Sequence, residues 1–260
     1  MTKGNSFLLS VGTLWLREMV RFYRQPSRIL GALGTPFVFW LLIGAGIGSS
    51  FRTDNYLFYF FPGTVLMILL FTAVFSTISL IEDRREGFLQ SVLVAPVPRE
   101  ILVLGKILGG TTLALIQGFI FLILGSFFGI SLSVGQWFVV GFAMFLNALA
   151  LTGLGFIVAW RLQSIQGFHA VMNLFLMPLW FLSGALFPPE GAPLWIQMIM
   201  KLNPLSYGMA ILRMSIYGVQ AKPAGFPGVV GSTFLAVTFA AAIFILASFL
   251  VSRRRVEDLA

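Results

Sequence analysis

Six long apolar stretches recur along the chain, and polar residues gather in the segments between them. The stretches cover residues 29–50, 57–81, 107–130, 136–160, 165–187 and 229–251. A bilayer's hydrocarbon core is about 30 Å thick, and a helix needs roughly 20 predominantly apolar residues to cross it. The pattern therefore predicts an all-α polytopic membrane protein with six transmembrane helices, forming a single domain over residues 1–260.

The stretch 188–228 has a different pattern, because it is apolar but rich in Pro and Gly. Its pieces 194–202 and 205–217 are too short to span a bilayer. Three aromatic residues in it suit a membrane–water boundary: Trp195, Tyr207 and Tyr217. We expect two short interfacial or re-entrant helices here, joined at Asn203-Pro204, on the outer side of the membrane before the sixth span.

The N-terminal stretch 6–28 has the pattern of an amphipathic helix. Four arginines recur at spacings of three and four and therefore share one helical face: Arg17, Arg21, Arg24 and Arg28. Apolar residues fill much of the remaining surface. We expect this helix to lie in the membrane interface with its basic face toward anionic headgroups. Gln25-Pro26 should break or redirect it.

Composition and charge agree with a membrane location. The 260 residues are 58% hydrophobic and only 10% charged, whereas soluble domains carry about 25% charged residues. The net charge of +8 would raise the question of nucleic acid in a soluble protein, but here it indicates topology. With the N-terminus inside the cell, all Lys and Arg except four lie on the cytoplasmic side; the four are Arg52, Lys201, Arg213 and Lys222. This imbalance predicts cytoplasmic N- and C-termini.

The segment 82–106 lies between the second and third spans and carries eight charged residues. Within it, residues 87–95 predict a short helix that ends at Pro96. Its apolar face consists of Phe88, Leu89, Val92 and Leu93. Such a helix at the cytoplasmic surface could dock into a groove on a partner protein, or the segment could be a solvated loop on the membrane. We favour docking, because of the apolar face and the Pro ending.

Residues that could carry chemistry of their own are sparse. Gly105-Lys106 lacks the upstream Gly and the following Ser or Thr of a phosphate-binding loop, so ATP would have to bind another chain. No catalytic or metal site is expected. His169 has no second His or Cys near it, and we favour a packing role over a functional one. Four polar residues within the spans could line a pathway or join helices: Gln117, Asn147, Gln166 and Asn173.

Two groups of motifs resemble a known family. Ile81–Gly87, followed by Leu93–Arg99 and Leu104–Lys106, closely resembles the cytoplasmic loop of type-2 ABC exporter permeases, which include drug, lipo-oligosaccharide and polysaccharide exporters. Leu182–Pro188, followed by Asn203–Tyr207, is the second match. The resemblance extends over nearly the whole chain. It is specific to the class rather than to a substrate.

The resemblance implies a permease subunit of the bacterial inner membrane that forms a homodimer with a second copy. Two separate ATPase subunits, which bind ATP and magnesium, would dock below the pair. The segment 86–97 would be the coupling helix. Its expected docking residues are Arg84, Arg85, Glu86, Gly87, Phe88, Leu89, Val92, Leu93 and Pro96. The helix 6–28 would be an interfacial gate helix with Arg17, Arg21 and Arg24, and the short helices in 188–228 would cap the pathway.

We therefore expect a permease, not an enzyme, that exports an amphiphilic compound, either drug-like or linked to lipid or glycan. An ion-coupled secondary transporter is one alternative, but it predicts carboxylates within the spans. A membrane enzyme predicts clustered His, Asp or Ser, which the sequence lacks. A non-catalytic assembly protein is the third alternative, and it leaves the Pro- and Gly-rich outer region unexplained.

Overall fold

The computed structural model describes residues 3–48, 56–94 and 98–253, and every regular element in these ranges is helical. Six helical segments are long and apolar enough to cross a membrane, which confirms the six predicted spans. The spans are formed by α2 (Pro26–Gly48), α3 (Tyr56–Ser76) continued by α4 (Ile78–Arg85), α6 (Glu100–Ser126), α7 (Val134–Arg161), α8 (Ile165–Trp180) continued by η1 (Phe181–Ala185), and α11 (Val229–Arg253).

Shorter helices complete the chain. They are α1 (Lys3–Tyr23), α5 (Phe88–Val94), α9 (Leu194–Leu202), α10 (Pro204–Tyr217) and the single turns η2 (Pro189–Gly191) and η3 (Val219–Ala221). The helices α9 and α10 lie where the sequence predicts two short helices, and Asn203 separates them. Its side chain accepts a hydrogen bond from the backbone N–H of Leu205 and so caps α10.

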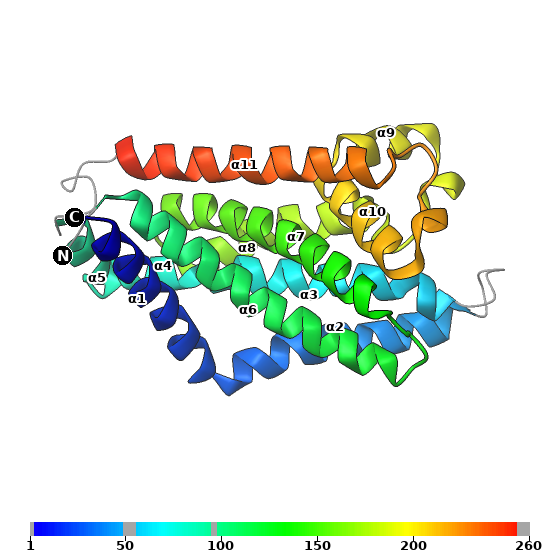
Figure 1. The fold of residues 1–260 in the computed structure, drawn as a ribbon, viewed down its shortest axis with the longest axis horizontal. Helices are drawn as coiled ribbons and strands as arrows, with labels where there is room; N and C mark the ends of the chain where they lie inside the picture. The colour runs from blue at the N-terminus through cyan, green and yellow to red at the C-terminus, as the bar shows by residue number, and fades with distance from the viewer. Residues whose placement is uncertain (1–2, 49–55, 95–97, 254–260) are drawn as a thin grey trace.

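The helix α3 forms the centre of the bundle (Figure 1). It packs against α2, α6 and α7, and nearly all of its side chains are buried. A helix that is apolar on all sides needs such surroundings. By contrast, much of the surface of α2, α8 and α11 is exposed in the single chain.

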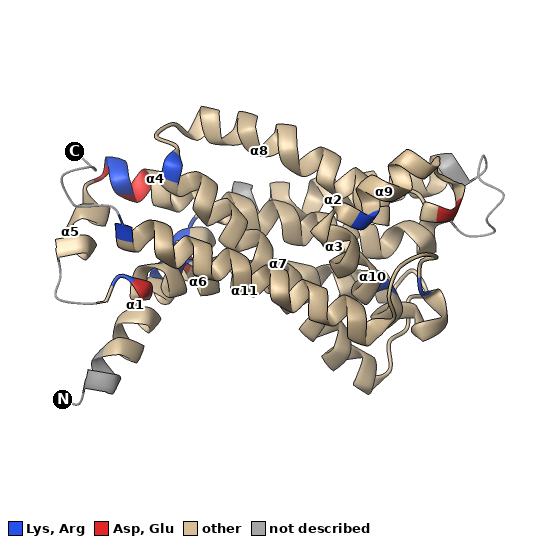
Figure 2. Ribbon diagram, turned by 90° about the horizontal axis from the view of Figure 1, so that it is seen from above, with Lys and Arg blue, Asp and Glu red and all other residues tan. Residues whose placement is uncertain are grey.

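Charged residues gather at the two ends of the bundle (Figure 2). The larger group lies in the second half of α1, where α4 and α5 meet, where α6 begins and where α11 ends; we call this the charged end. A smaller group lies at the opposite, far end, near α9 and α10. Long apolar helices between two charged ends are the arrangement expected of a bilayer-spanning protein.

Two boundaries differ from the sequence-based prediction. The predicted helix 6–28 is two helices, because α1 ends at Tyr23 and Pro26 begins α2. Proline is well suited to a first helical turn, where its missing N–H costs nothing. The helix α6 begins at Glu100, seven residues before the predicted start of the third span at 107. Residues 100–106 were therefore wrongly assigned to a connecting segment.

At the far end, the helix formed by α8 and η1 breaks at Gly184, whose φ of +84° is the left-handed conformation that glycine adopts readily. A break at membrane depth leaves backbone carbonyls that need new donors. Side chains of other segments supply these donors. Asn203, just before α10, donates to the carbonyl of Leu179, and Ser206 of α10 donates to that of Leu182. Tyr59 and Arg213 both donate to the carbonyl of Gly184, and Tyr56 donates to that of Leu186. These bonds hold together the two motifs Leu182–Pro188 and Asn203–Tyr207.

Candidate functional site

The helix α4 carries the central α3 into the charged end of the molecule. It ends at Arg85, and Gly87 just beyond has a φ of +76°, a conformation that commonly follows helix ends because only glycine adopts it without strain. The helix α5 begins at the next residue. The charged segment after the second span is therefore a direct, tightly turned continuation of the most buried helix in the molecule.

Asp83 of α4 is the most enclosed charged residue at this end, because none of its side chain is exposed. Arg17 of α1 binds this carboxylate in a bidentate manner: its Nη2 lies 2.6 Å from Oδ1, and its Nη1 lies 2.9 Å from Oδ2. Arg21, one turn further along α1, donates to Oδ1 at 2.8 Å. Lys106 of α6 donates to Oδ2. Paired guanidinium–carboxylate bonds of this kind are among the strongest polar contacts in proteins.

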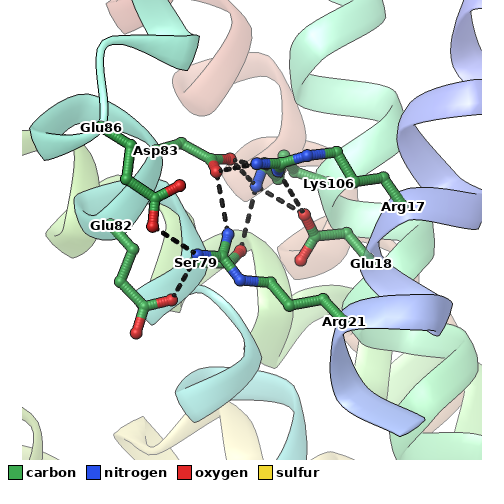
Figure 3. Close-up of polar contacts among 8 residues, drawn as sticks. All are labelled: Arg17, Glu18, Arg21, Ser79, Glu82, Asp83, Glu86 and Lys106. Carbon is green, nitrogen blue, oxygen red and sulfur yellow. Dashed lines mark hydrogen bonds and ion pairs between the residues drawn. The ribbon is translucent and has the colours of Figure 1, made fainter. Parts of the chain in front are cut away.

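Four further residues surround these (Figure 3). The Lys106 Nζ donates to Glu18 Oε1 at 2.6 Å and to Ser79 Oγ at 3.0 Å. Arg21 Nη2 lies 2.9 Å from Glu82 Oε2 and 3.4 Å from Glu86 Oε1. We call these eight residues the charge cluster: Arg17, Glu18, Arg21, Ser79, Glu82, Asp83, Glu86 and Lys106. It joins α1, α4 and α6.

The cluster sets three cations against four carboxylates. Burial alone would lower the pKa of Arg21, but the nearby Asp83 and Glu82 outweigh it, and the pKa is raised above its ordinary value. Arg21 therefore stays charged. Buried charges are costly to desolvate unless they are paired, and here each buried charge faces opposite charges from another helix.

Two glycines of α6 bring α1 close enough to form the cluster. A Cβ placed on Gly105 would lie 2.7 Å from Leu14 Cβ, and one on Gly109 would lie 2.9 Å from the Glu18 side chain. Without side chains at these positions, α1 lies directly on α6. This contact places Glu18 beside Lys106, and it gives the G-x-x-x-G spacing of Gly105 and Gly109 a definite use.

The other side of α4 is tied to the turn between α7 and α8. Arg84 donates to the carbonyls of Trp160 and Leu162, each at 2.8 Å. Arg85 donates to the carbonyl of Gln163, with Nη2 at 3.0 Å. Carbonyls at the end of a helix have no partner within it, and the two arginines supply donors. The four residues Glu82, Asp83, Arg84 and Arg85 thus connect α4 to α1, to α6 and to the end of α7 with the turn that follows it.

The helix α5 packs its apolar face onto this assembly. Leu89 is 1% exposed, and Phe88, Val92 and Leu93 are partly buried against the core. The guanidinium of Arg17 lies over the ring of Phe88, 3.9 Å from its centroid. The exposed edge carries the polar Gln90 and Ser91 and the apolar Val94, with the exposed Glu86 just before the helix.

The structure places the predicted site residues as follows. Arg17 and Arg21 are not directed toward headgroups as we expected; they turn to Asp83, because an enclosed carboxylate of the same chain lies within reach. Arg24 is exposed. Arg84 and Arg85 reach the turn after α7. Pro96 lies outside the described residues. Sequence reasoning missed Glu18, Ser79 and Lys106. The signal for Lys106 was its place in the motif Leu104–Lys106.

Polar residues within the spans take different roles. Asn147 of α7 donates to the carbonyl of Gly208 in α10 at 3.3 Å, and the hydroxyl of Thr72 in α3 donates to Gln117 in α6. Both join helices. His169 packs against the ring of Phe75, with centroids 4.8 Å apart. Gln166 and Asn173 are exposed on α8 and have no hydrogen-bond partner among the described residues.

The chain has six apolar spans, a charge cluster at one end of the bundle and the short helices α9 and α10 at the other. These features define an integral membrane protein, and its described part shows no evident catalytic centre. The family comparison gives the class: the chain belongs to the ABC-2 type transporter family, whose model matches residues 10–217. It is therefore a membrane permease of ABC transport.

Individual relatives agree with this assignment. A putative transport permease, ycf38, of Cyanophora paradoxa is 30% identical over 214 residues, which cover 80% of this chain and 74% of the relative. The inner membrane transport permease YadH of Escherichia coli K12 is 22% identical over 96% of this chain and 97% of its own. The daunorubicin resistance ABC transporter permease protein DrrB1 of Streptomyces coeruleorubidus is 27% identical over 79% of this chain and 74% of that relative.

Proposed function

We propose that this chain is the transmembrane subunit of an ATP-driven exporter. ATP and magnesium would bind a separate ATPase subunit, since the sequence has no phosphate-binding loop. The family membership supports the coupling to an ATPase. The drug-resistance permease among the relatives supports the outward direction of transport.

The observation that carries this proposal is the way α5 is held. Only Glu86 and Gly87 separate it from α4. In turn, α4 is bonded to α1 and α6 by the charge cluster and to the α7–α8 turn by Arg84 and Arg85. A force applied to α5 by a closing ATPase would therefore reach three parts of the bundle at once. Since its apolar face is packed against the chain, we propose that α5 meets the ATPase with its exposed edge of Glu86, Gln90, Ser91 and Val94.

The charged end would face the cytoplasm. The predicted cytoplasmic side holds most of the Lys and Arg of the sequence, as the positive-inside rule requires. The exposed polar residues of α8, Gln166 and Asn173, are costly in contact with lipid alone. We propose that they face a second copy of this chain across a pathway. The surrounding apolar surface of α2 and α8 suits an amphiphilic cargo.

Site-specific photo-crosslinking tests the docking edge. A photoreactive amino acid at Gln90 should link this chain to its ATPase in membranes that co-express both. The same group at Phe127, which is 82% exposed at the far end, is the matched control and should not. Crosslinking at Phe127 with none at Gln90 would reverse the proposed orientation.

A second arm tests coupling. Leu89→Pro should break α5, because proline removes a backbone donor and clashes with the preceding turn. We expect the complex to insert into the membrane but to lose transport-linked ATP hydrolysis. Gln90→Ala, on the exposed edge of the same helix, should leave insertion and helicity intact. Full coupled activity in Leu89→Pro would contradict a role for α5.

A further inference from the structure

Two hollows adjoin where α1 turns into α2 beside α6. The first, of about 690 Å³, has Arg17, Arg21, Arg24 and the carboxylate of Glu86 in its wall, together with apolar residues such as Leu16. The second, of about 470 Å³, lies between the elbow and α6 and is almost wholly apolar. Val20 and Arg24 line both hollows. A hollow with arginine side chains in its wall therefore opens directly beside one that is almost wholly apolar.

Arg24 directly follows the last residue of α1 and lies outside the charge cluster. Arg17 and Arg21 are bound to Asp83, Glu82 and Glu86. Arg24 is exposed, and within the described ranges it has neither an acidic partner nor a hydrogen bond from its guanidinium. The donors of an unpaired guanidinium form a planar fork that matches the two non-bridging oxygens of a phosphate diester.

A second group in the apolar hollow also lacks a partner. Gln117 of α6 lines it and is only 1% exposed. Its Oε1 accepts a hydrogen bond from Thr72, but its buried Nε2 has none in the described structure. A buried N–H without an acceptor is destabilising by more than a typical hydrogen bond gains. The apolar wall of the hollow thus contains one residue whose buried N–H still lacks an acceptor.

From these three observations we infer that the elbow between α1 and α2 is a binding site for one anionic phospholipid. The headgroup phosphate pairs with Arg24, an ester carbonyl accepts from Gln117 Nε2, and an acyl chain lies along Ile29, Ile116 and Ile120. Arg24 lines both hollows, whereas Gln117 and the three isoleucines line the apolar one. Anionic lipids are also the negatively charged components of the bilayer surface. The inference does not depend on the direction or energy source of transport.

Lipid binding to the full-length chain can be measured by native mass spectrometry of the detergent-purified protein, titrated with phosphatidylglycerol or phosphatidylcholine. We expect one tight phosphatidylglycerol and no comparable phosphatidylcholine. Arg24→Gln should weaken the tight phosphatidylglycerol about tenfold, the usual consequence of losing a hydrogen bond to a charged group. Arg161→Gln is the matched control, because Arg161 is likewise exposed, at the end of α7, and should change nothing.

Gln117 is tested with Gln117→Met, which keeps an unbranched side chain but removes the donor. This variant should melt no lower than the natural protein in phosphatidylcholine, since an unsatisfied N–H is gone, yet it should lose the extra thermal stability that phosphatidylglycerol confers. Ile116→Trp, which fills the hollow from an exposed position, should act in the same way.

Three results would overturn the inference. Equal binding of the two lipids by the natural protein would exclude an anionic site. Equal weakening by Arg24→Gln and Arg161→Gln would show general attraction of anionic lipid to a basic surface. Unchanged phosphatidylglycerol stabilisation in both Gln117→Met and Ile116→Trp would place the lipid elsewhere.

Discussion

One carboxylate, that of Asp83, faces three cationic side chains from two other helices. Such a group adds less to stability than its contacts suggest, because its desolvation offsets much of the attraction. The group instead fixes the geometry of this end of the molecule. Arg17, Arg21 and Lys106 can pair with Asp83 at the same time only when α1, α4 and α6 hold one relative position. We infer that Asp83 fixes the register of the charged end.

Replacing Asp83 by Asn tests this at the scale of a single residue. The amide cannot balance three neighbouring positive charges, and removing one partner of a buried ion pair costs about 3–5 kcal/mol. We expect a lower thermal midpoint of the purified protein. The transport-linked ATPase activity of the proposed complex should fall as well, because α5 would no longer be tied to α1 and α6.

The matched control is Glu86→Gln in the same cluster. The Glu86 side chain is 59% exposed and lies 3.4 Å from Arg21. An exposed pair contributes about 0–1 kcal/mol, so the thermal midpoint should barely move. Equal losses in the two variants would mean that burial of the carboxylate is not what matters. Adding Lys106→Met to Asp83→Asn should recover part of the loss, because the number of unbalanced cations falls.

At the scale of elements, hydrophobic length predicted the six spans and the two short helices α9 and α10 closely. It failed at the start of α6, because Glu100 and Lys106 made residues 100–106 look like a segment in water. Lys106 is instead 3% exposed, paired with Asp83 and Glu18, which lie 23 and 88 residues away in sequence. A single sequence shows that a residue is charged but not which distant charge balances it. The same limit hid the inward turn of Arg17 and Arg21.

The crossing of α1 over α6 gives a prediction at this scale. Gly105→Ala would place a Cβ 2.7 Å from the Leu14 Cβ, closer than such atoms approach in proteins, and α1 would have to move. Overpacking of this kind costs about 1–3 kcal/mol. We expect a lower thermal midpoint. A cysteine at Arg17 should also react faster with a maleimide, because α1 would be loosened.

Gly12→Ala on α1 is the opposite test. Nothing lies within 4 Å of the added Cβ, and alanine favours a helix over glycine by about 0.5–1 kcal/mol. This variant should be slightly more stable than the natural protein. A destabilising Gly12→Ala together with a neutral Gly105→Ala would show that α1 does not pack on α6 through these glycines.

On the scale of the whole molecule, the bundle is incomplete on one side. The inner face of α8 is buried through Phe168, Met172, Leu176 and Trp180, at a regular spacing of four. Its other face presents Gln166, Ala170 and Asn173. Polar side chains within a span are rarely left to lipid. We therefore expect this face of α8 to meet a second copy of the chain.

Cysteine crosslinking tests the pairing directly, because the natural sequence contains no cysteine. Ala170→Cys and Asn173→Cys, one helical turn apart, should each give a covalent dimer in membranes treated with short bis-maleimides. Ile123→Cys, which is 53% exposed on α6, should stay monomeric under the same treatment, since we expect α6 to face lipid there. Dimers from Ile123→Cys with none from the α8 positions would place the interface on the other side of the bundle. Selective dimers through α8 would show that the exposed polar residues of this span lie between two subunits.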